Sequence, residues 1–129
     1  MKKAHLFFSV SVLLLASCNK EPGVGGLATI SGKVYVYDVN GTFTDTLSEY
    51  YAMDERVYII YGTDDSTYDE DFRTSLDGSF EFNYLTPGSY TLYAYSDTTN
   101  ASGFTPVTKT VTITDSKEQL YIGNINILK

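Results

Sequence analysis

Short stretches of this chain alternate apolar and polar residues, and pairs of turn-forming residues separate the stretches. Between Asp77-Gly78 and Pro87-Gly88, the phenylalanines Phe80 and Phe82 alternate with polar residues. Glycine tolerates the positive φ of a tight turn, and proline fixes φ at the first central position of one. Successive side chains of a β-strand point to opposite faces, so this period of two predicts strands and argues against helices, whose period is 3.6.

The same alternation occurs on both sides of this segment. It places Ile30, Gly32, Val34 and Val36 on one face of a first strand, and further strands are expected at 56–61, 72–75, 79–83, 89–95, 107–113 and 120–128. The segment from Asn40 to Glu55 lacks the pattern and is predicted to be a long loop or an irregular edge. We therefore predict an all-β fold, an antiparallel β-sandwich of six to seven strands.

The first 18 residues combine a basic start, ten largely apolar residues and the small pair Ala16-Ser17 before Cys18. This arrangement is typical of a helical, cleaved signal peptide, and the apolar stretch is much shorter than the roughly 20 residues of a spanning helix. The run 15–18 resembles the bacterial lipobox, in which cleavage precedes a cysteine whose thiol carries a diacylglyceryl group. The resemblance implies a lipoprotein acylated at Cys18 and anchored in the outer membrane; exposure at the cell surface is a hypothesis, and the periplasmic face is the alternative.

Cleavage would divide the chain into a signal peptide at 1–17, a glycine-rich flexible tether at 18–27 and one β-sandwich domain at 28–129. The mature chain of 112 residues is long enough for one domain. Because Cys18 is the only cysteine, the domain has no disulfide and must depend on its hydrophobic core.

Composition excludes several classes of function. The mature chain would carry seven basic and 16 acidic residues, which argues against nucleic acid as a partner. The only histidine, His5, would leave with the signal peptide, so no Ser-His-Asp triad and no Cys-His pair can form. We expect no cofactor and no enzymatic activity, although a small hydrolase based on two carboxylates stays an alternative.

A sharper pattern covers residues 74–94, which read T-x-x-D-G-x-F-x-F-x-x-L-x-P-G-x-Y-x-L-x-A. This pattern resembles the signature of carboxypeptidase-regulatory-like domains, and residues 30–34 are similar to the first strand of that family. The resemblance implies a transthyretin-like, or prealbumin-like, sandwich of seven strands. The segment 42–55 is longer than the family's usual link and is particular to this chain.

Two sets of residues are candidate sites. Five carboxylates lie within eight positions and could supply oxygen ligands for calcium, although a solvated acidic loop explains them as well; they are Asp64, Asp65, Asp69, Glu70 and Asp71. Four tyrosines on the polar sides of two strands would form an aromatic face if those strands were neighbours; they are Tyr35, Tyr37, Tyr93 and Tyr95. Such a face could bind a glycan or a protein, or it could consist only of cross-strand pairs.

These observations leave three hypotheses. The first is a non-catalytic, membrane-tethered interaction module with a protein partner in the cell envelope. The second is a carbohydrate-binding accessory of an outer-membrane nutrient-acquisition system, and the third is the carboxylate-based hydrolase. In each case the lipid bilayer is a partner through the acylated Cys18.

Overall fold

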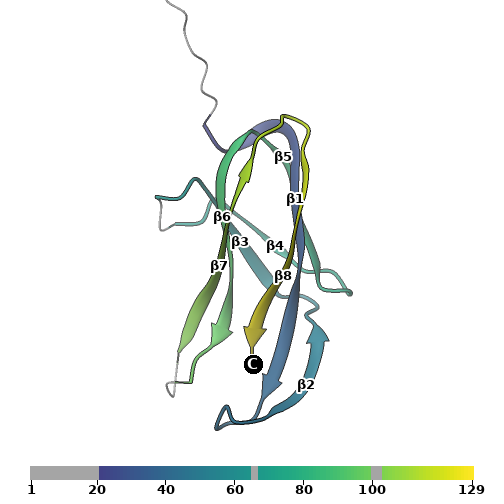
Figure 1. Cartoon of the computed structure of the whole chain (residues 1–129), viewed down its shortest axis with the longest axis vertical. Coiled ribbons are helices and arrows are strands. Elements are labelled where there is room, and N and C mark those ends of the chain that lie inside the picture. Colours follow the sequence, from purple (N-terminus) through teal and green to yellow (C-terminus); the bar gives the residue numbers. More distant parts are fainter. Residues whose placement is uncertain (1–20, 65–66, 100–102) are drawn as a thin grey trace, which may run out of the picture.

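The computed structural model describes residues 21–64, 67–99 and 103–129. Within these residues the chain forms eight strands, β1 (Val24–Val39), β2 (Thr46–Tyr51), β3 (Arg56–Tyr61), β4 (Glu70–Arg73), β5 (Ser79–Leu85), β6 (Gly88–Asp97), β7 (Phe104–Ile113) and β8 (Gln119–Leu128). They form two facing sheets (Figure 1). The predicted β-sandwich is confirmed, and the predicted signal peptide and Cys18 lie outside the described residues.

The first sheet, sheet A, is organised around β1, which runs along most of the length of the domain (Figure 1). The first half of β1 pairs with β5 and its second half pairs with β2, both antiparallel. β8 pairs with β1 in parallel from Thr29 to Tyr37 and therefore occupies the other edge of the strand. This parallel pair is an exception to the antiparallel pairing that was predicted.

The second sheet, sheet B, has the strand order β4-β3-β6-β7, and all of its pairs are antiparallel. Its central strand β3 has buried residues on both faces, as its apolar sequence predicted. On the inner face lie Val57 and Ile59, and on the outer face Ile60 is 7% exposed.

The hydrophobic core lies between the two sheets and contains the apolar residues that the alternation placed inward, together with others such as Leu85 and Ile113. It includes Ile30, Val34, Val36, Val57, Ile59, Phe80, Phe82, Leu85, Tyr90, Leu92, Ala94, Ile113, Ile125 and Ile127. The rings of Phe80 and Phe82 are 6.1 Å apart, and Phe72 on β4 contacts Phe82 across the sandwich at 6.2 Å.

Two predicted boundaries are corrected by the structure. The segment at 40–55, expected to be a long loop or an irregular edge, contains β2, an edge strand of sheet A whose six residues are all exposed. The expected tether at 18–27 is also shorter than predicted, because β1 begins at Val24 and pairs there with Leu85. Neither segment shows a clean period of two, since neither has one face covered by the core.

The two tight turns at 77–78 and 87–88 carry the chain from one sheet to the other. The predicted tight turn at Asp77-Gly78 is present, and it joins strands of different sheets, because β4 belongs to sheet B and β5 to sheet A. Gly78 has a φ of +78°, and a Cβ there would lie 2.8 Å from the Cβ of Tyr51. Hydrogen bonds from the hydroxyl and backbone N–H of Ser79 to Asp77 lower the pKa of that carboxyl and fix the turn.

A buried tyrosine ties the start of the described chain to the turn before β6. The Tyr90 hydroxyl donates a hydrogen bond to the Thr86 carbonyl at 2.6 Å and accepts one from the Gly23 N–H at 2.9 Å. Gly88 allows Pro22 to pack closely against this turn, because a Cβ at position 88 would lie 2.5 Å from the Pro22 ring. Tyr90 is fully buried, so its hydroxyl has no access to water as a substitute partner.

Tyr90→Phe should therefore lower the free energy of unfolding by about 1–3 kcal/mol, because Gly23 and Thr86 lose a buried partner. Urea denaturation measures this change. Tyr84→Phe is the matched control, because Tyr84 is 70% exposed and its hydroxyl can bond to water. Equal destabilisation by the two substitutions would contradict the anchoring role of Tyr90.

Candidate functional site

The four predicted tyrosines do not form one face. Tyr35 and Tyr37 lie on β1 in sheet A, whereas Tyr93 and Tyr95 lie on β6 in sheet B. The sequence placed all four on the polar sides of their strands, but the two strands belong to different sheets. Each pair instead joins tyrosines from neighbouring segments of its own sheet.

On sheet B, Tyr93 and Tyr95 join Tyr58 and Tyr68 in what we call the sheet B tyrosine cluster. Tyr58 and Tyr93 are register partners, and their rings stack at 4.9 Å with an interplanar angle of 13°. Tyr68 and Tyr95 contact Tyr58 edge-on at 4.8 and 5.6 Å. Tyr93 is consequently 8% exposed, which corrects the prediction that its ring is free to meet a ligand.

The packing of Tyr93 predicts a late ionisation. Burial by its neighbours, followed by the nearby Tyr95, raises the pKa of Tyr93 to about 12, and burial beside Glu70 raises that of Tyr61 to about 12. Both pKa values lie above the pKa of roughly 10 of an unfolded tyrosine. The contribution of these two tyrosines to stability is therefore complete below pH 10 and is lost as the pH rises toward 12. In an alkaline titration, Tyr93→Phe should remove part of the phenolate absorbance that appears as the pH approaches 12. A curve identical to that of the wild-type protein would contradict this packing.

On sheet A, Tyr35 contacts Tyr37 at 5.3 Å and Tyr51 at 5.0 Å, both edge-on. The Tyr35 hydroxyl donates a hydrogen bond to Glu49 at 3.1 Å, and the Lys33 Nζ lies 4.7 Å from the centre of the Tyr51 ring. These rings satisfy one another and their polar neighbours. Tyr35 and Tyr51 form a cross-strand pair, which is one of the interpretations left open by the sequence, whereas Tyr35 and Tyr37 lie on the same strand.

The carboxylates of the acidic segment have separate partners. Asp69 accepts a hydrogen bond from the Tyr61 N–H at 2.7 Å, Glu70 accepts one from the Tyr61 hydroxyl at 3.0 Å, and Asp71 lies 3.1 Å from the Arg56 Nε. Asp64 accepts a bond from the Thr63 hydroxyl at 3.4 Å, and Asp65 lies outside the described residues. Among the described residues, no three His, Cys, Asp or Glu side chains are placed to hold a metal ion.

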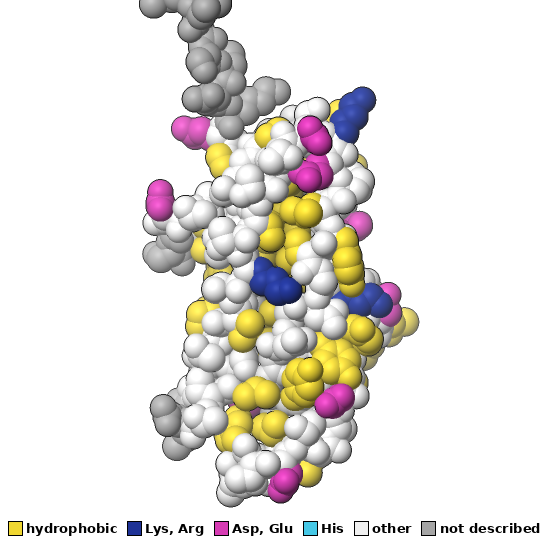
Figure 2. Space-filling view, in the orientation of Figure 1, with side chains coloured by type: hydrophobic (Ala, Val, Ile, Leu, Met, Phe, Trp, Pro, Cys, Tyr) yellow, Lys and Arg dark blue, Asp and Glu magenta, His cyan; other side chains and the backbone are white. Residues whose placement is uncertain are grey.

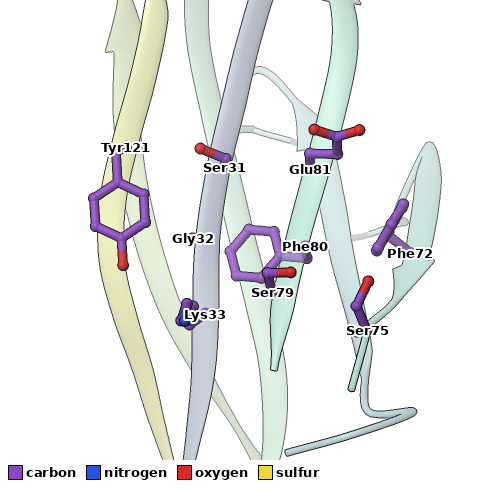
Figure 3. A pocket seen from close by; sticks show the side chains of 9 residues that line it. All are labelled: Ser31, Gly32, Lys33, Phe72, Ser75, Ser79, Phe80, Glu81 and Tyr121. Carbon is purple, nitrogen blue, oxygen red and sulfur yellow. The ribbon is translucent and has the colours of Figure 1, made fainter. Parts of the chain in front are cut away.

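A groove of about 360 Å³ crosses three strands of sheet A and reaches β4 of sheet B (Figure 3). Its walls come from Tyr121 on β8 and from the region of Phe72 and Ser75, while Ser31, Gly32 and Lys33 on β1 lie between them (Figure 3). Ser79, Phe80 and Glu81 of β5 complete the lining. The groove therefore combines hydroxyls, one carboxylate, one ammonium and aromatic rings.

Strand register aligns three of these residues in a row. Ser31 is the register partner of both Glu81 on β5 and Tyr121 on β8. Because Ile30 and Gly32 are buried, alternation turns Ser31 to the outer face. A small side chain between an aromatic ring and a carboxylate leaves space above the strand, and Tyr121 is 61% exposed beside that space.

Hydrogen bonds and charges orient the polar side of the groove. The Thr29 hydroxyl donates a hydrogen bond to the side-chain oxygen Oδ1 of Asn83 at 2.8 Å. The side-chain Nδ2 of Asn83 in turn donates one to Oε1 of Glu81 at 3.1 Å. The Lys33 Nζ lies 3.6 Å from an oxygen of Asp77. Glu81 is thus oriented by a neighbour and keeps one carboxylate oxygen available, so this site can accept and donate hydrogen bonds to a polar ligand.

Acidic side chains do not gather into one charged face on the visible side of the molecule, whereas hydrophobic side chains do gather in one region (Figure 2). Figure 2 shows acidic side chains spread over the visible face and hydrophobic ones gathered where β1 and β8 lie. Among the described residues, no helix is long and apolar enough to span a membrane.

Comparison with known proteins identifies the fold. No family model matches the chain, and no curated protein matches it. A crystal structure from Pseudomonas aeruginosa, described as a "putative carbohydrate binding protein", is similar with a TM-score of 0.50. The match covers 83% of this chain and 91% of that chain at 15% identity. The class that the fold defines is therefore the β-sandwich proteins.

Proposed function

We propose that this protein is a non-catalytic carbohydrate-binding lipoprotein of the cell envelope, and that the groove beside Tyr121 is its sugar site. The observation that carries the proposal is the row Tyr121–Ser31–Glu81, in which an exposed ring and an oriented carboxylate flank a small residue. A pyranose has one apolar C–H face and a rim of hydroxyls. The groove offers a matching surface for each of these features.

The chemistry of each side chain supports this assignment. The Tyr121 ring can stack on the apolar face of a sugar, while Glu81 accepts hydrogen bonds from hydroxyls, and bonds to charged acceptors are the stronger ones. Lys33 and the serines supply donors. The volume of about 360 Å³ lies within the range of small-molecule sites.

Binding without hydrolysis is the activity that fits this lining. Glycoside hydrolysis requires two carboxyl groups that flank the scissile bond. Of the residues that line the groove, Glu81 is the only acidic one. The described function of the Pseudomonas aeruginosa neighbour is in accord with the proposal, although a shared fold does not by itself define function.

A glycan array tests the proposal directly. Purified protein in a detergent without a sugar headgroup should bind a subset of uncharged oligosaccharides above background. Uncharged glycans are the expected class because an excess of acidic residues repels anionic ligands. Absence of binding to every glycan on the array would contradict the proposed function.

The membrane anchor has its own test. Cys18→Ser should move nearly all of the protein from the membrane fraction to the soluble fraction, because a serine hydroxyl does not receive the lipid and two or more acyl chains are needed for firm anchoring. Immunoblotting of fractions from the native host measures the distribution. A variant that stays with the membranes would contradict lipidation at Cys18.

A further inference from the structure

A second cleft lies at one end of the sandwich, near the end of β8 that is marked C in Figure 1. It has a volume of about 290 Å³ and is lined by Glu55, Tyr95, Asp97, Phe104 and Lys129. It shares no lining residue with the groove beside Tyr121. We propose that this cleft binds an arginine side chain of a partner polypeptide, and this inference is independent of the sugar site.

Two aromatic rings form the apolar walls of the cleft. Phe104 on β7 is the register partner of Asp97 on β6, and Tyr95 lies two residues before Asp97 on the same face of that strand. Phe104 is 74% exposed and Tyr95 is 41% exposed. Exposed ring faces attract cations, and arginine is the cation that most often makes this contact in proteins.

The acidic groups of the cleft differ in their pairing. Glu55 forms an ion pair with Lys129, which neutralises one carboxylate. Asp97 forms no ion pair with any other residue in the described parts of the chain, and this partly buried residue lines the cleft. A cation that enters the cleft therefore meets one uncompensated negative charge.

The combination selects a basic side chain over other ligands. A neutral ligand would partly desolvate Asp97 without supplying a charge, and an anionic ligand would be repelled. Arginine has an apolar stem that packs along the rings, and its planar guanidinium both stacks on aromatic faces and binds carboxylates with two parallel hydrogen bonds. Lysine carries the same charge, but its ammonium group is not planar and cannot stack on a ring or bind a carboxylate in this two-bonded way.

NMR titration of the full chain with N-acetyl-arginine amide tests this assignment. At millimolar concentrations the probe should shift the backbone signals of Tyr95, Asp97 and Phe104. N-acetyl-citrulline amide, which has nearly the same shape and no charge, should bind about threefold to tenfold more weakly. Equal binding of the two probes, or no shift with arginine, would overturn the proposal.

Variants separate the cleft from general electrostatic attraction. Asp97→Asn and Phe104→Ala should each weaken binding of the arginine probe by about threefold or more. Asp115→Asn is the matched control, because Asp115 is exposed outside the cleft and its removal changes the net charge equally. An equal loss in Asp115→Asn would overturn the proposal, as would glucosamine shifting the same signals as strongly as arginine, since that result assigns the cleft to an amino sugar.

Discussion

Phe82→Ala is expected to lower the free energy of unfolding by about 3–5 kcal/mol, a large part of the roughly 5–15 kcal/mol that stabilises a domain. Phe82 is 1% exposed and contacts Phe80 in sheet A and Phe72 in sheet B. Truncation removes buried apolar area and leaves a cavity between the sheets. Because the chain has a single cysteine, no disulfide compensates for the loss.

Equilibrium unfolding in urea, followed by tyrosine fluorescence and circular dichroism, measures this change. Leu76→Ala is the control for loss of an apolar side chain, because Leu76 is 83% exposed and its removal should change the stability by less than about 0.5 kcal/mol. If the two variants unfolded at the same urea concentration, the sandwich would not depend on the core described above.

Tyr121→Ala is expected to weaken binding of an array-selected oligosaccharide by about tenfold or more, since one aromatic ring at the centre of a site often contributes over 1 kcal/mol. Tyr121 is 61% exposed, so its truncation should leave the fold intact. Tyr121→Phe keeps the ring and should retain most of the affinity. Isothermal titration calorimetry measures the dissociation constants.

The matched control for this prediction is Tyr50→Ala. Tyr50 lies on β2, is 44% exposed and does not line the groove. Its substitution removes an exposed tyrosine and should leave the affinity unchanged. If Tyr50→Ala reduced the affinity as much as Tyr121→Ala, the sugar would be bound by surface tyrosines in general and not by the groove.

Local pattern predicted most of the sandwich, because each inward position has a covered face that requires an apolar residue. Ile30, Val34, Val36, Phe80 and Phe82 were all placed correctly. The segment of β2 was predicted only as a long loop or an irregular edge, because all of its residues are exposed and hydrophobic alternation does not mark a strand there. The assignment of strands to sheets was also not predictable, because a tight turn can join strands of one sheet or of two.

The candidate site depends on pairing between distant parts of the chain. Tyr121 and Glu81 meet only through Ser31, which lies about 90 residues before the first and 50 before the second. The parallel pairing of β8 with β1 has no local signal in the sequence. Tyrosines on the polar sides of strands were identified, but they group by sheet. Tyr93 is covered in part by Tyr58 of β3, which the sequence pattern had not grouped with it.

The central claim is that a sugar binds in the groove of sheet A, and NMR mapping with an array-selected oligosaccharide tests it most directly. We predict saturable shifts in the backbone amide signals of Ser31, Ser79, Glu81 and Tyr121, which line the groove together. Signals of the sheet B tyrosine cluster should stay unchanged. Shifts confined to sheet B, or no saturable shift in the four groove residues, would contradict the claim.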